Sequence, residues 1–503
     1  MQSIHGATLH NGNAELVRVE TLITRGMPQL ILVGMPDRVA MEARERLPSA
    51  LRSHSFPFPK TRVLVNLVPA QVPKRGMPLD LAMAVSLLVA QSCIPAPRGR
   101  WLFLGELDLD GRIIPPERGT LLAALATEGN FAGIIGAPEV AHEAALAPGV
   151  LAFGAVDLSE VVQILLHPDQ HVAAFGQENA GKREDSRLED VRGQTLAREA
   201  AILSVAGGHP LFLQGPPGTG KSMLAKRISG LLPPLNPNQA LEVARVEACL
   251  GRVPSLPRQA PLRAPHTSVS AQGVLGGGRP LRPGEISRAH HGVLFLDELP
   301  EFARPVLEGL RQPLEEGEVR LQRADSWACF PAKVLLVAAR NPCPCGYLTH
   351  PKIGCQCTTL QVQRYLHKAS GPLLDRFDLF VEMGPVAPEA LDAPPTSPTQ
   401  SEATQKIESA RKIQADRLSG DMPAKGGEMQ FDHLLNCGVS AAAKRRIHQA
   451  AHSLHWSGRA QLRCLRVART IADLMESKEI SEGHVLEALS FRRPILELEG
   501  AKG

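Results

Sequence analysis

The chain of 503 residues contains few aromatic side chains. Phenylalanine, tyrosine and tryptophan together make up 4% of it, with three tryptophans and two tyrosines. This scarcity argues against a protein that binds single-stranded nucleic acid by stacking bases on many aromatic rings. The net charge is also small, at +4. Such a charge does not by itself indicate a nucleic-acid partner, so any basic surface must be local.

Long hydrophobic runs are also missing. The longest mostly apolar stretch, residues 79–94, contains Asp80 and is too short to span a bilayer. The N-terminus lacks the basic segment followed by an apolar one that marks a signal peptide. We therefore expect a cytoplasmic protein with no membrane partner. In a reducing compartment, clustered cysteines are more often metal ligands or redox groups than structural disulfides.

The N-terminal third of the chain, residues 1–170, alternates short apolar strands with helices. Strand patterns stand at 16–23, 29–35 and 62–68, and residues 36–54 have the spacing of an amphipathic helix. The alternation predicts an α+β or α/β domain.

The remaining chain divides by composition. Residues 171–195 are polar and charged, and predict a linker. Strands and helices alternate again over 196–384, which predicts a second α/β domain. Residues 385–402 are rich in proline and predict a surface loop. Residues 403–503 have little strand pattern and predict a helical bundle.

A glycine-rich loop follows the short apolar strand at 211–213 and precedes a helix. It matches the G-x-x-x-x-G-K-[ST] pattern in the strand–loop–helix context that this motif requires. Backbone N–H groups of such a loop surround phosphate oxygens, and the helix N-terminus adds positive potential. Lys221 is expected to reach the β- and γ-phosphates of ATP, and Ser222 to bind Mg²⁺. The predicted nucleotide-binding residues are Gly215, Pro216, Pro217, Gly218, Thr219, Gly220, Lys221 and Ser222.

The sequence GVLFLDELPEF at 292–302 predicts a buried strand that ends in Asp297 and Glu298. We expect Asp297 to contribute to nucleotide binding through Mg²⁺, and Glu298 to polarise the attacking water. The alternatives are a glycine turn that binds nothing and an acidic strand end without a catalytic role. Two matching halves of one site disfavour both.

A third strand at 334–339 leads to Asn341, whose side chain is expected to reach the γ-phosphate and the attacking water. Arg376 stands just before a further strand, in the segment 371–383. We expect Arg376 to have no partner in its own chain and to stabilise transition-state charge in a neighbouring subunit. A salt bridge at a helix end is the alternative.

These motifs, together with residues 264–302 and RVARTIADL at 466–474, resemble the magnesium-chelatase-like AAA+ ATPases, and among them the YifB/ComM family. The resemblance covers essentially the whole chain. It implies an α/β multidomain protein with a Lon-protease-like (S5-like) α+β N-terminal domain, an AAA+ P-loop core and a small C-terminal helical lid. It also implies a homohexameric helicase that uses ATP to drive branch migration of DNA in natural transformation.

The resemblance assigns Asn341 as sensor 1, Arg376 as the arginine finger and Arg459 as sensor 2. With Glu298, these form the predicted catalytic set. Arg340 departs from the family, which has an apolar residue, often methionine, at this position. The choice of sensor 2 stays open by one turn, because Arg459 is followed by Arg463, Arg466 and Arg469.

A Lon-type protease needs a serine activated by a nearby lysine. Where a Lon-like enzyme has Gly-Pro-Ser-Ala-Gly, this chain has Gly76-Met-Pro-Leu-Asp80, and where the lysine is expected it has Gly119-Thr-Leu121. The catalytic dyad is absent. We therefore interpret the N-terminal domain as a structural or DNA-contacting collar without peptidase activity.

Two insertions are candidates for contact with single-stranded or branched DNA. One is the glycine-rich segment 271–284, and the other is 315–333, which predicts a hairpin before the sensor strand. Phosphate contacts there would make binding salt-dependent and sequence-independent. The alternative for each residue is an ordinary solvated charge. The candidates are Arg279, Arg282, Arg320, Arg323 and Lys333.

Four of the nine cysteines form two C-x-C pairs, which begin two residues after Asn341. Four thiolates suit a tetrahedral structural Zn²⁺, although C-x-C is tighter than the common C-x₂-C spacing. A redox switch is an alternative, and His350 is a possible substitute ligand. The predicted zinc ligands are Cys343, Cys345, Cys355 and Cys357, and the predicted magnesium ligands are Ser222 and Asp297.

The motifs are compatible with three functions. The first is a ring-forming DNA motor. The second is a chelatase-type ATPase that drives metal insertion or protein remodelling, although chelatase subunits generally lack the N-terminal domain. The third is a scaffold that binds ATP without turnover, which would need none of Glu298, Asn341 and Arg376.

Overall fold

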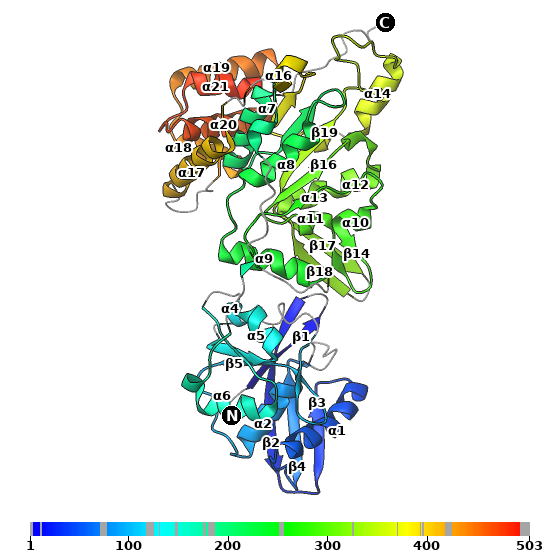
Figure 1. Cartoon of the computed structure of the whole chain (residues 1–503), viewed down its shortest axis with the longest axis vertical. Helices are drawn as coiled ribbons and strands as arrows, with labels where there is room; N and C mark the ends of the chain where they lie inside the picture. Colours follow the sequence, from blue (N-terminus) through cyan, green and yellow to red (C-terminus); the bar gives the residue numbers. More distant parts are fainter. Residues whose placement is uncertain are drawn as a thin grey trace.

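The structure is a computed structural model, and it describes most of the chain. It consists of an N-terminal α/β domain, an α/β core above it and a set of C-terminal helices beside the core (Figure 1). The described residues are 4–10, 13–70, 78–116, 125–129, 131–145, 149–174, 178–179, 187–250, 256–323, 326–369, 371–392, 394, 397–417 and 425–492.

The N-terminal domain is built on a seven-stranded mixed sheet in the order β3-β4-β2-β1-β5-β8-β9. Strand β2 pairs antiparallel with both β1 and β4, and the other neighbours run parallel. The strands are β1 (Ile4–His10), β2 (Asn13–Thr24), β3 (Gln29–Val33), β4 (Arg62–Val68), β5 (Trp101–Leu104), β8 (Gly133–Gly136) and β9 (Leu151–Gly154), with the small pair β6 (Glu106–Leu107) and β7 (Ile113–Ile114). These bounds confirm the strands predicted at 16–23, 29–35 and 62–68.

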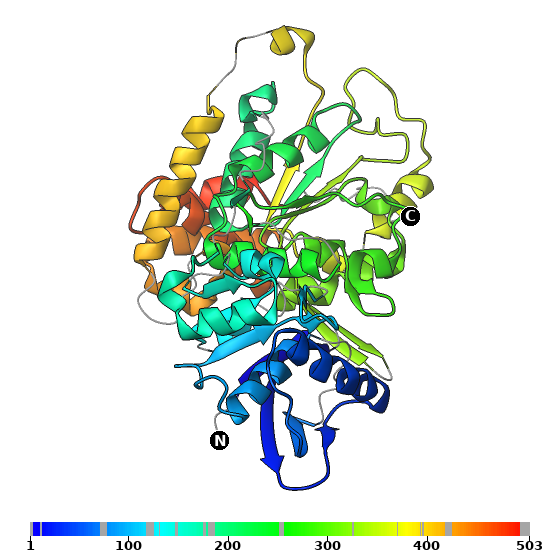
Figure 2. The ribbon, with the colours of Figure 1, turned by 60° about the horizontal axis from the view of Figure 1, so that its bottom comes forward.

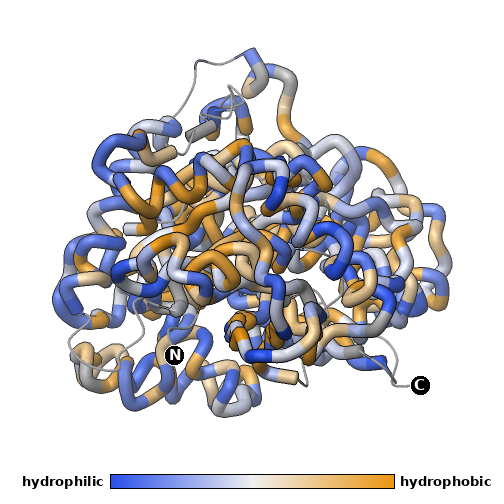
Figure 3. Tube along the Cα trace, turned by 90° about the horizontal axis from the view of Figure 1, so that it is seen from below, coloured by the Kyte–Doolittle hydropathy of each residue, from blue (hydrophilic) through white to orange (hydrophobic). Residues whose placement is uncertain are grey.

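Helices α1 (Asp37–Ser53), α2 (Asp80–Ala90), α4 (Leu125–Glu128), α5 (Pro138–Ala144) and α6 (Leu158–Leu166) complete this domain. Helix α2 is the apolar run noted in the sequence, and it is buried from Asp80 to Leu88. Among the described residues, no helix combines the length and hydrophobicity that crossing a membrane requires. Most of the apolar segments lie toward the middle of the molecule in Figure 3, and hydrophilic segments dominate its rim.

Asp80 anchors the start of α2. Its carboxylate lies 3.1 Å from Arg46 Nε and accepts the Leu107 N–H at 3.4 Å. Burial raises the pKa of Asp80 to about 7, and Arg46 opposes that rise. Gly76 and residues 119–121, which carried the protease comparison, lie outside the described residues. The Lon-like classification of this domain therefore stays a prediction.

The core is a five-stranded parallel sheet in the order β13-β16-β19-β11-β20. The strands are β11 (Leu211–Gln214), β13 (Leu262–Arg263), β16 (Val293–Leu296), β19 (Leu335–Arg340) and β20 (Leu379–Glu382). Strands β11, β16 and β19 are buried along their whole length, as expected of apolar strands covered on both faces. The loops after these three strands emerge at one edge of the sheet, where parallel α/β folds bind ligands.

Helices and two hairpins surround this sheet. They are η2 (Leu188–Asp190), α7 (Thr195–Gly207), α8 (Lys221–Leu231), α9 (Pro237–Ala248), α10 (Ala271–Leu275), α11 (Glu285–Arg288), η3 (Leu299–Glu301), α12 (Arg304–Gly309), α13 (Arg311–Glu316), α14 (Thr359–Lys368) and α15 (Gly371–Leu374), with the pairs β14 (Gly276–Gly277) and β15 (Arg282–Pro283), and β17 (Glu318–Arg323) and β18 (Ser326–Pro331). The β17–β18 pair confirms the hairpin predicted within 315–333.

Part of the predicted linker 171–195 has regular structure, and its C-terminal part belongs to the core. Residues Pro168–Gln170 form η1, and β10 (Glu178–Asn179) pairs with β12 (Leu256–Pro257) of the core. Leu188 and Val191 are buried in the core cluster. The linker therefore ends before residue 188, and these two apolar side chains, which a charged surrounding sequence obscured, belong to the core.

The C-terminal region is helical, as predicted. It contains α17 (Gln400–Asp416), η4 (Gly426–Glu428), α18 (Phe431–Asn436), α19 (Ala441–Ser453), α20 (Gly458–Leu474) and α21 (Glu482–Ser490). The proline-rich segment before it includes the short helix α16 (Pro388–Asp392). Helices α17 and α20 pack against α7 of the core. Buried His209, which follows α7, strengthens this contact. Its ring is hydrogen-bonded to Asp378 of the core and to Thr470 of α20, both at 2.8 Å.

The N-terminal domain lies against the end of the core that carries the β17–β18 hairpin (Figure 1), and it comes forward in Figure 2. Ala14 of β2 packs against a small apolar cluster that joins the two parts. The residues that the second α/β domain contributes to this cluster are Ala248, Cys249, Leu281, Ala328 and Phe330.

Candidate ATP site and four-cysteine cluster

The glycine-rich loop lies between β11 and α8, at the centre of the sheet edge. A side chain at Gly215 would meet the Met383 carbonyl oxygen at 2.1 Å, and Gly218 and Gly220 have positive φ of 78° and 92°. Only glycine fits these positions without strain. Lys221 Nζ donates to the carbonyls of Gly215 at 2.7 Å and Pro216 at 2.8 Å. Burial lowers the pKa of Lys221. The loop therefore has the backbone form of a phosphate cradle.

The two predicted magnesium ligands meet in space. Ser222 Oγ donates to Asp297 Oδ2 at 2.5 Å. Asp297 Oδ1 accepts the N–H of Glu298, at 2.9 Å. Hydroxyl and carboxylate oxygens are ligands that Mg²⁺ prefers. The arrangement fits a magnesium ion held by Ser222 and Asp297 beside bound phosphates.

Glu298 has an exposed side chain and a left-handed backbone, with φ 49° and ψ 48°. A residue with a Cβ pays on the order of 1–3 kcal/mol for such a conformation, and residues held this way cluster at functional sites. The turn places Glu298 at the open edge of the sheet, directly after the magnesium-ligand candidate Asp297.

Asn341 follows β19, the strand next to β11. Its Oδ1 accepts from Lys221 Nζ at 3.1 Å. The N–H of Asn341 faces the hydroxyl of Tyr365, whose pKa burial raises to about 12. Arg340, the departure from the family pattern, is buried; its Nε donates to Gln214 at 2.7 Å and its guanidinium lies 5.0 Å from the Phe212 ring centroid. The larger side chain is thus accommodated without displacing Asn341.

Arg376 has a partner in its own chain, so the expectation that it lacks one is wrong. Its guanidinium donates to Glu315 Oε2 at 2.6 Å, and it lowers the pKa of that carboxyl. Arg459, exposed in the first turn of α20, is also close enough to favour ionised Glu315. The two predicted catalytic arginines therefore approach the same carboxylate, and their roles in catalysis stay predictions.

The other three arginines of α20 are held by this chain. Arg463 bonds the Asp375 carbonyl, and Arg466 Nε donates to the Met429 carbonyl at 2.6 Å. Arg469 is fully buried and pairs with Asp473 at 2.9 Å. Of the four candidates for sensor 2, Arg459 is the exposed one.

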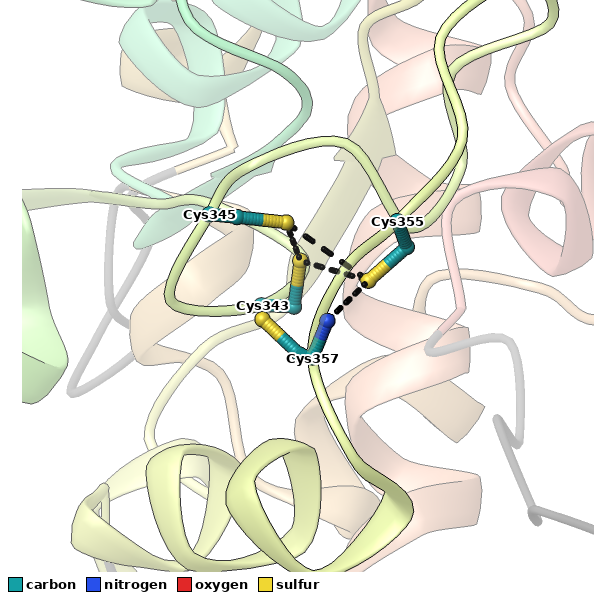
Figure 4. A group of neighbouring side chains, drawn as sticks. All are labelled: Cys343, Cys345, Cys355 and Cys357. Carbon is teal, nitrogen blue, oxygen red and sulfur yellow. Dashed lines mark hydrogen bonds between the residues drawn. The ribbon is translucent and has the colours of Figure 1, made fainter.

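The four cysteines converge. Their Sγ atoms all lie within 4.8 Å of one another (Figure 4). The Sγ atoms of Cys343 and Cys345 are 3.3 Å apart, and each lies 3.6 Å from Sγ of Cys355. Four thiolates about 2.3 Å from a tetrahedral Zn²⁺ would be roughly 3.8 Å apart, so the cluster fits the ion. His350 is a loop residue, because its Nδ1 accepts from the N–H groups of Lys352 and Ile353.

The cysteine loop and the helix that follows it both contact residues of the candidate ATP site. On one side, a Cβ added to Gly346 would lie 2.6 Å from Pro217 of the glycine-rich loop. On the other, α14 starts directly after Cys357, and it carries Tyr365, which contacts Asn341, and Lys368, which lies 3.3 Å from Glu301. The cysteine loop thus packs against the glycine-rich loop, and α14, which follows it, contacts the segment after Glu298.

The structure brings four of the five DNA-contact candidates into one part of the core. Gly276, in the hairpin that carries Arg279 and Arg282, lies against Leu321 of β17, whose hairpin carries Arg320 and Arg323. All four arginines are exposed, and Arg320 pairs with Glu318 at 2.6 Å. Lys333 differs, because it lies at the base of the β17–β18 hairpin rather than at its tip.

A cluster that the sequence analysis missed joins the base of the β17–β18 hairpin to the start of β16, the strand that precedes Asp297. Glu242 Oε2 lies 2.8 Å from His290 Nε2 and 2.6 Å from His291 Nε2. His290 Nδ1 accepts the Lys333 N–H at 3.1 Å, so the neutral ring carries its proton on Nε2. A protonated Nε2 has no lone pair with which to bind a metal ion. Burial lowers the pKa of His290 to about 4. The cluster is a hydrogen-bonded junction, and its sequence signal was the pair of histidines before β16.

The parallel sheet, the glycine-rich loop on its central strand and the acidic end of a neighbouring strand define an AAA+ P-loop protein. Comparison with protein families agrees with this class. Three family models match the chain: "Magnesium chelatase, subunit ChlI" over residues 187–391, "Subunit ChlI of Mg-chelatase" over 19–139, and "Magnesium chelatase, subunit ChlI C-terminal" over 398–492.

Two of the relatives are similar over nearly their whole length, and a third over about half of its length. Competence protein ComM of Haemophilus influenzae is 37% identical over 97% of this chain and 96% of its own. Protein YifB of Salmonella typhimurium is 38% identical over the same shares. The magnesium-chelatase 38 kDa subunit of Cereibacter sphaeroides is 26% identical over 30% of this chain and 51% of its own. The chain belongs to the YifB/ComM family of magnesium-chelatase-like AAA+ ATPases.

Proposed function

We propose that this protein is an ATP-driven, ring-forming DNA motor, and specifically a branch-migration helicase that acts in natural transformation or recombination. The observation that carries the proposal is a physical link between its two sites. The hairpin that bears the DNA-contact candidates continues through Lys333 directly into β19, the strand that ends beside the ATP site at Asn341. The full-length similarity to competence protein ComM supports the same function.

The hairpin base is also tied to the strand that carries Asp297 and Glu298. The Lys333 N–H donates to His290, and the Lys333 carbonyl accepts the N–H of His291 at 2.7 Å. The histidines immediately precede β16. A shift of either strand during ATP hydrolysis would therefore move the hairpin, which is what a motor requires of a loop that contacts its substrate.

The proposed chemistry is ATP hydrolysis. The glycine-rich loop and Lys221 bind the phosphates, and Ser222 and Asp297 would hold a Mg²⁺ ion that would supply charge neutralisation there. Glu298 orients and polarises the attacking water, and Asn341 positions it. In this scheme Arg376 leaves Glu315 and reaches the site of a neighbouring subunit, Arg459 acts as sensor 2, and a structural Zn²⁺ occupies the cysteine cluster. The protein works in the cytoplasm as a homohexamer, with its Lon-like N-terminal domain as a collar.

A phosphate-release assay tests this proposal against its main alternative, a chelatase-type motor. ATP turnover is measured alone, with forked or four-way DNA, and with chelatase partner subunits, using Lys221→Ala as background. The DNA motor predicts stimulation by DNA. Stimulation by the chelatase partners alone would favour metal insertion, and the absence of turnover under all conditions would favour a scaffold.

Replacing Arg320 and Arg323 together with alanine is expected to weaken DNA binding for every sequence tested. Two lost phosphate contacts should make the slope of log affinity against log salt shallower by roughly 1.5. Fluorescence anisotropy over a salt series measures this. Arg304→Ala is the matched control, because Arg304 is an exposed arginine of the same core that pairs with Glu308 at 2.7 Å. Unchanged affinity at moderate salt for the double variant would refute the assignment.

Arg376→Ala subunits are expected to lose ATP turnover and to regain part of it when mixed with Lys221→Ala subunits. A finger that acts between subunits is restored wherever a Lys221→Ala neighbour supplies Arg376 to an intact phosphate site. Random mixing in a ring creates such pairs at about a quarter of the interfaces. The assay is phosphate release after mixing at constant total protein. No recovery in mixed rings would show that Arg376 does not act in trans.

A further inference from the structure

Trp327 stands out among the three tryptophans of the chain. The Trp101 ring lies 5.9 Å from that of Phe153, and its N–H donates to Arg98. Trp456 is covered by Arg492, at 5.3 Å from the ring centroid. Trp327, by contrast, is 58% exposed. Leaving a large aromatic side chain in water forgoes the favourable burial of its apolar surface, so an exposed indole on a strand is suited to a partner.

The β17–β18 hairpin holds this ring in a fixed direction. Val319, Leu321, Ala328 and Phe330 alternate along its two strands, and the hairpin packs this apolar face against Leu281 and the end of α9. Trp327 pairs with Gln322 in register and therefore lies on the opposite face. The apolar face anchors the stem, and the indole is presented outward beside the tip.

The side chains that neighbour Trp327 on its face of the hairpin are charged or polar rather than apolar. Arg320 is its diagonal neighbour across the strands, within reach of a large aromatic ring, and it pairs with Glu318 at 2.6 Å. Arg323, at the end of β17, alternates onto the opposite face. Among the large hydrophobic side chains that are exposed in the described part of the chain, Trp327 is the one that this hairpin carries. A protein partner would favour a continuous apolar patch. One flat ring with an arginine beside it is suited instead to an unpaired base and a neighbouring phosphate.

We propose that Trp327 is a stacking platform for an unpaired base of single-stranded DNA, at the point where the β17–β18 hairpin contacts the DNA. The assignment rests on the proposed function as a DNA motor. It also refines the expectation from composition, because one well-placed ring beside Arg320 performs a task for which many rings are not needed. Duplex DNA, whose bases are already stacked, gains little from this ring.

The test uses the full-length protein and its own fluorescence. Labelled oligothymidylate of about 20 nucleotides and a duplex of the same length are titrated while anisotropy reports binding and tryptophan emission reports stacking. Wild-type emission is expected to fall on binding the single strand, and Trp327→Phe should abolish most of that change while keeping affinity within about threefold. Trp327→Ala should lower single-strand affinity by about 5- to 100-fold, with a smaller effect on duplex and none on DNA-free ATP turnover.

Other outcomes separate the two proposals. Single-strand binding with unchanged emission in the wild type, or with equal affinity for Trp327→Ala, would overturn the stacking assignment and leave the DNA motor standing. An emission change on oligomerisation but not on DNA addition would also overturn it, in favour of a subunit contact. No DNA binding by anisotropy would overturn both proposals. Trp101→Phe is the control for emission from a ring packed inside the protein.

Discussion

Glu298→Gln is expected to lower the rate of ATP hydrolysis by about 10²- to 10⁴-fold while ATP binding persists, because the change removes the group that polarises water and little else. Glutamine has nearly the same size and leaves the bond between the residue 298 N–H and Asp297 in place. The phosphate contacts of Lys221 and the oxygens of Ser222 and Asp297 are also untouched. Phosphate release measures turnover, and a fluorescent nucleotide measures binding.

Two comparisons sharpen this result. Glu308→Gln makes the same chemical change on α12, where Glu308 pairs only with Arg304 among the contacts of the described structure, and turnover should stay within about twofold of wild type. Lys221→Ala should instead lose nucleotide affinity as well as turnover. A Glu298→Gln protein that hydrolyses ATP at the wild-type rate would remove Glu298 from the proposed mechanism.

Loss of the cysteine cluster is expected to damage both stability and nucleotide binding. Cys343 is buried, and the loop that it holds packs Gly346 against Pro217 and positions α14 with Tyr365 at Asn341. We expect one zinc per chain in protein purified under reducing conditions. Cys343→Ser should abolish that zinc and lower the Tm by roughly 5–10 °C, from a loss on the order of 2–4 kcal/mol.

The readouts for this prediction are metal analysis, thermal unfolding and the Kd for a fluorescent nucleotide. Cys93→Ser is the control, because Cys93 is an exposed free cysteine of the N-terminal domain, remote in sequence from the cluster. Nucleotide affinity should fall by about tenfold in Cys343→Ser and stay unchanged in Cys93→Ser. Stoichiometric zinc in Cys343→Ser, or its absence from the wild type, would contradict the zinc assignment.

Local patterns predicted much of this structure. The strand–loop–helix around Lys221 is encoded by a glycine spacing that few other structures require, and the hairpin within 315–333 was predicted from the segment that precedes the sensor strand. The four cysteines were found because their identity and spacing carry the chemistry directly. In each case the relevant residues lie within about 20 positions of one another, so the sequence itself displays their relation.

Contacts between distant segments could not be predicted in this way. Glu315 and Arg376 are 61 positions apart, and no local pattern indicates that they pair. Tyr365 reaches Asn341 only because the cysteine loop turns the chain back, and Glu242 meets His290 only because α9 packs beside α11, which His290 follows in the chain. Leu188 and Val191 were hidden in a charged segment, since two apolar residues give no periodicity.

The measurement that tests the central claim most directly is strand exchange on a synthetic four-way DNA junction with mobile arms. Labelled junction, wild-type protein, Mg²⁺ and ATP are incubated, and duplex products are separated by size. We predict ATP-dependent conversion of the junction to duplexes, with no conversion by Lys221→Ala or Glu298→Gln, although Glu298→Gln still binds ATP. A protein that hydrolyses ATP normally and binds the junction, yet leaves it intact, would contradict the proposal that this ATPase moves DNA.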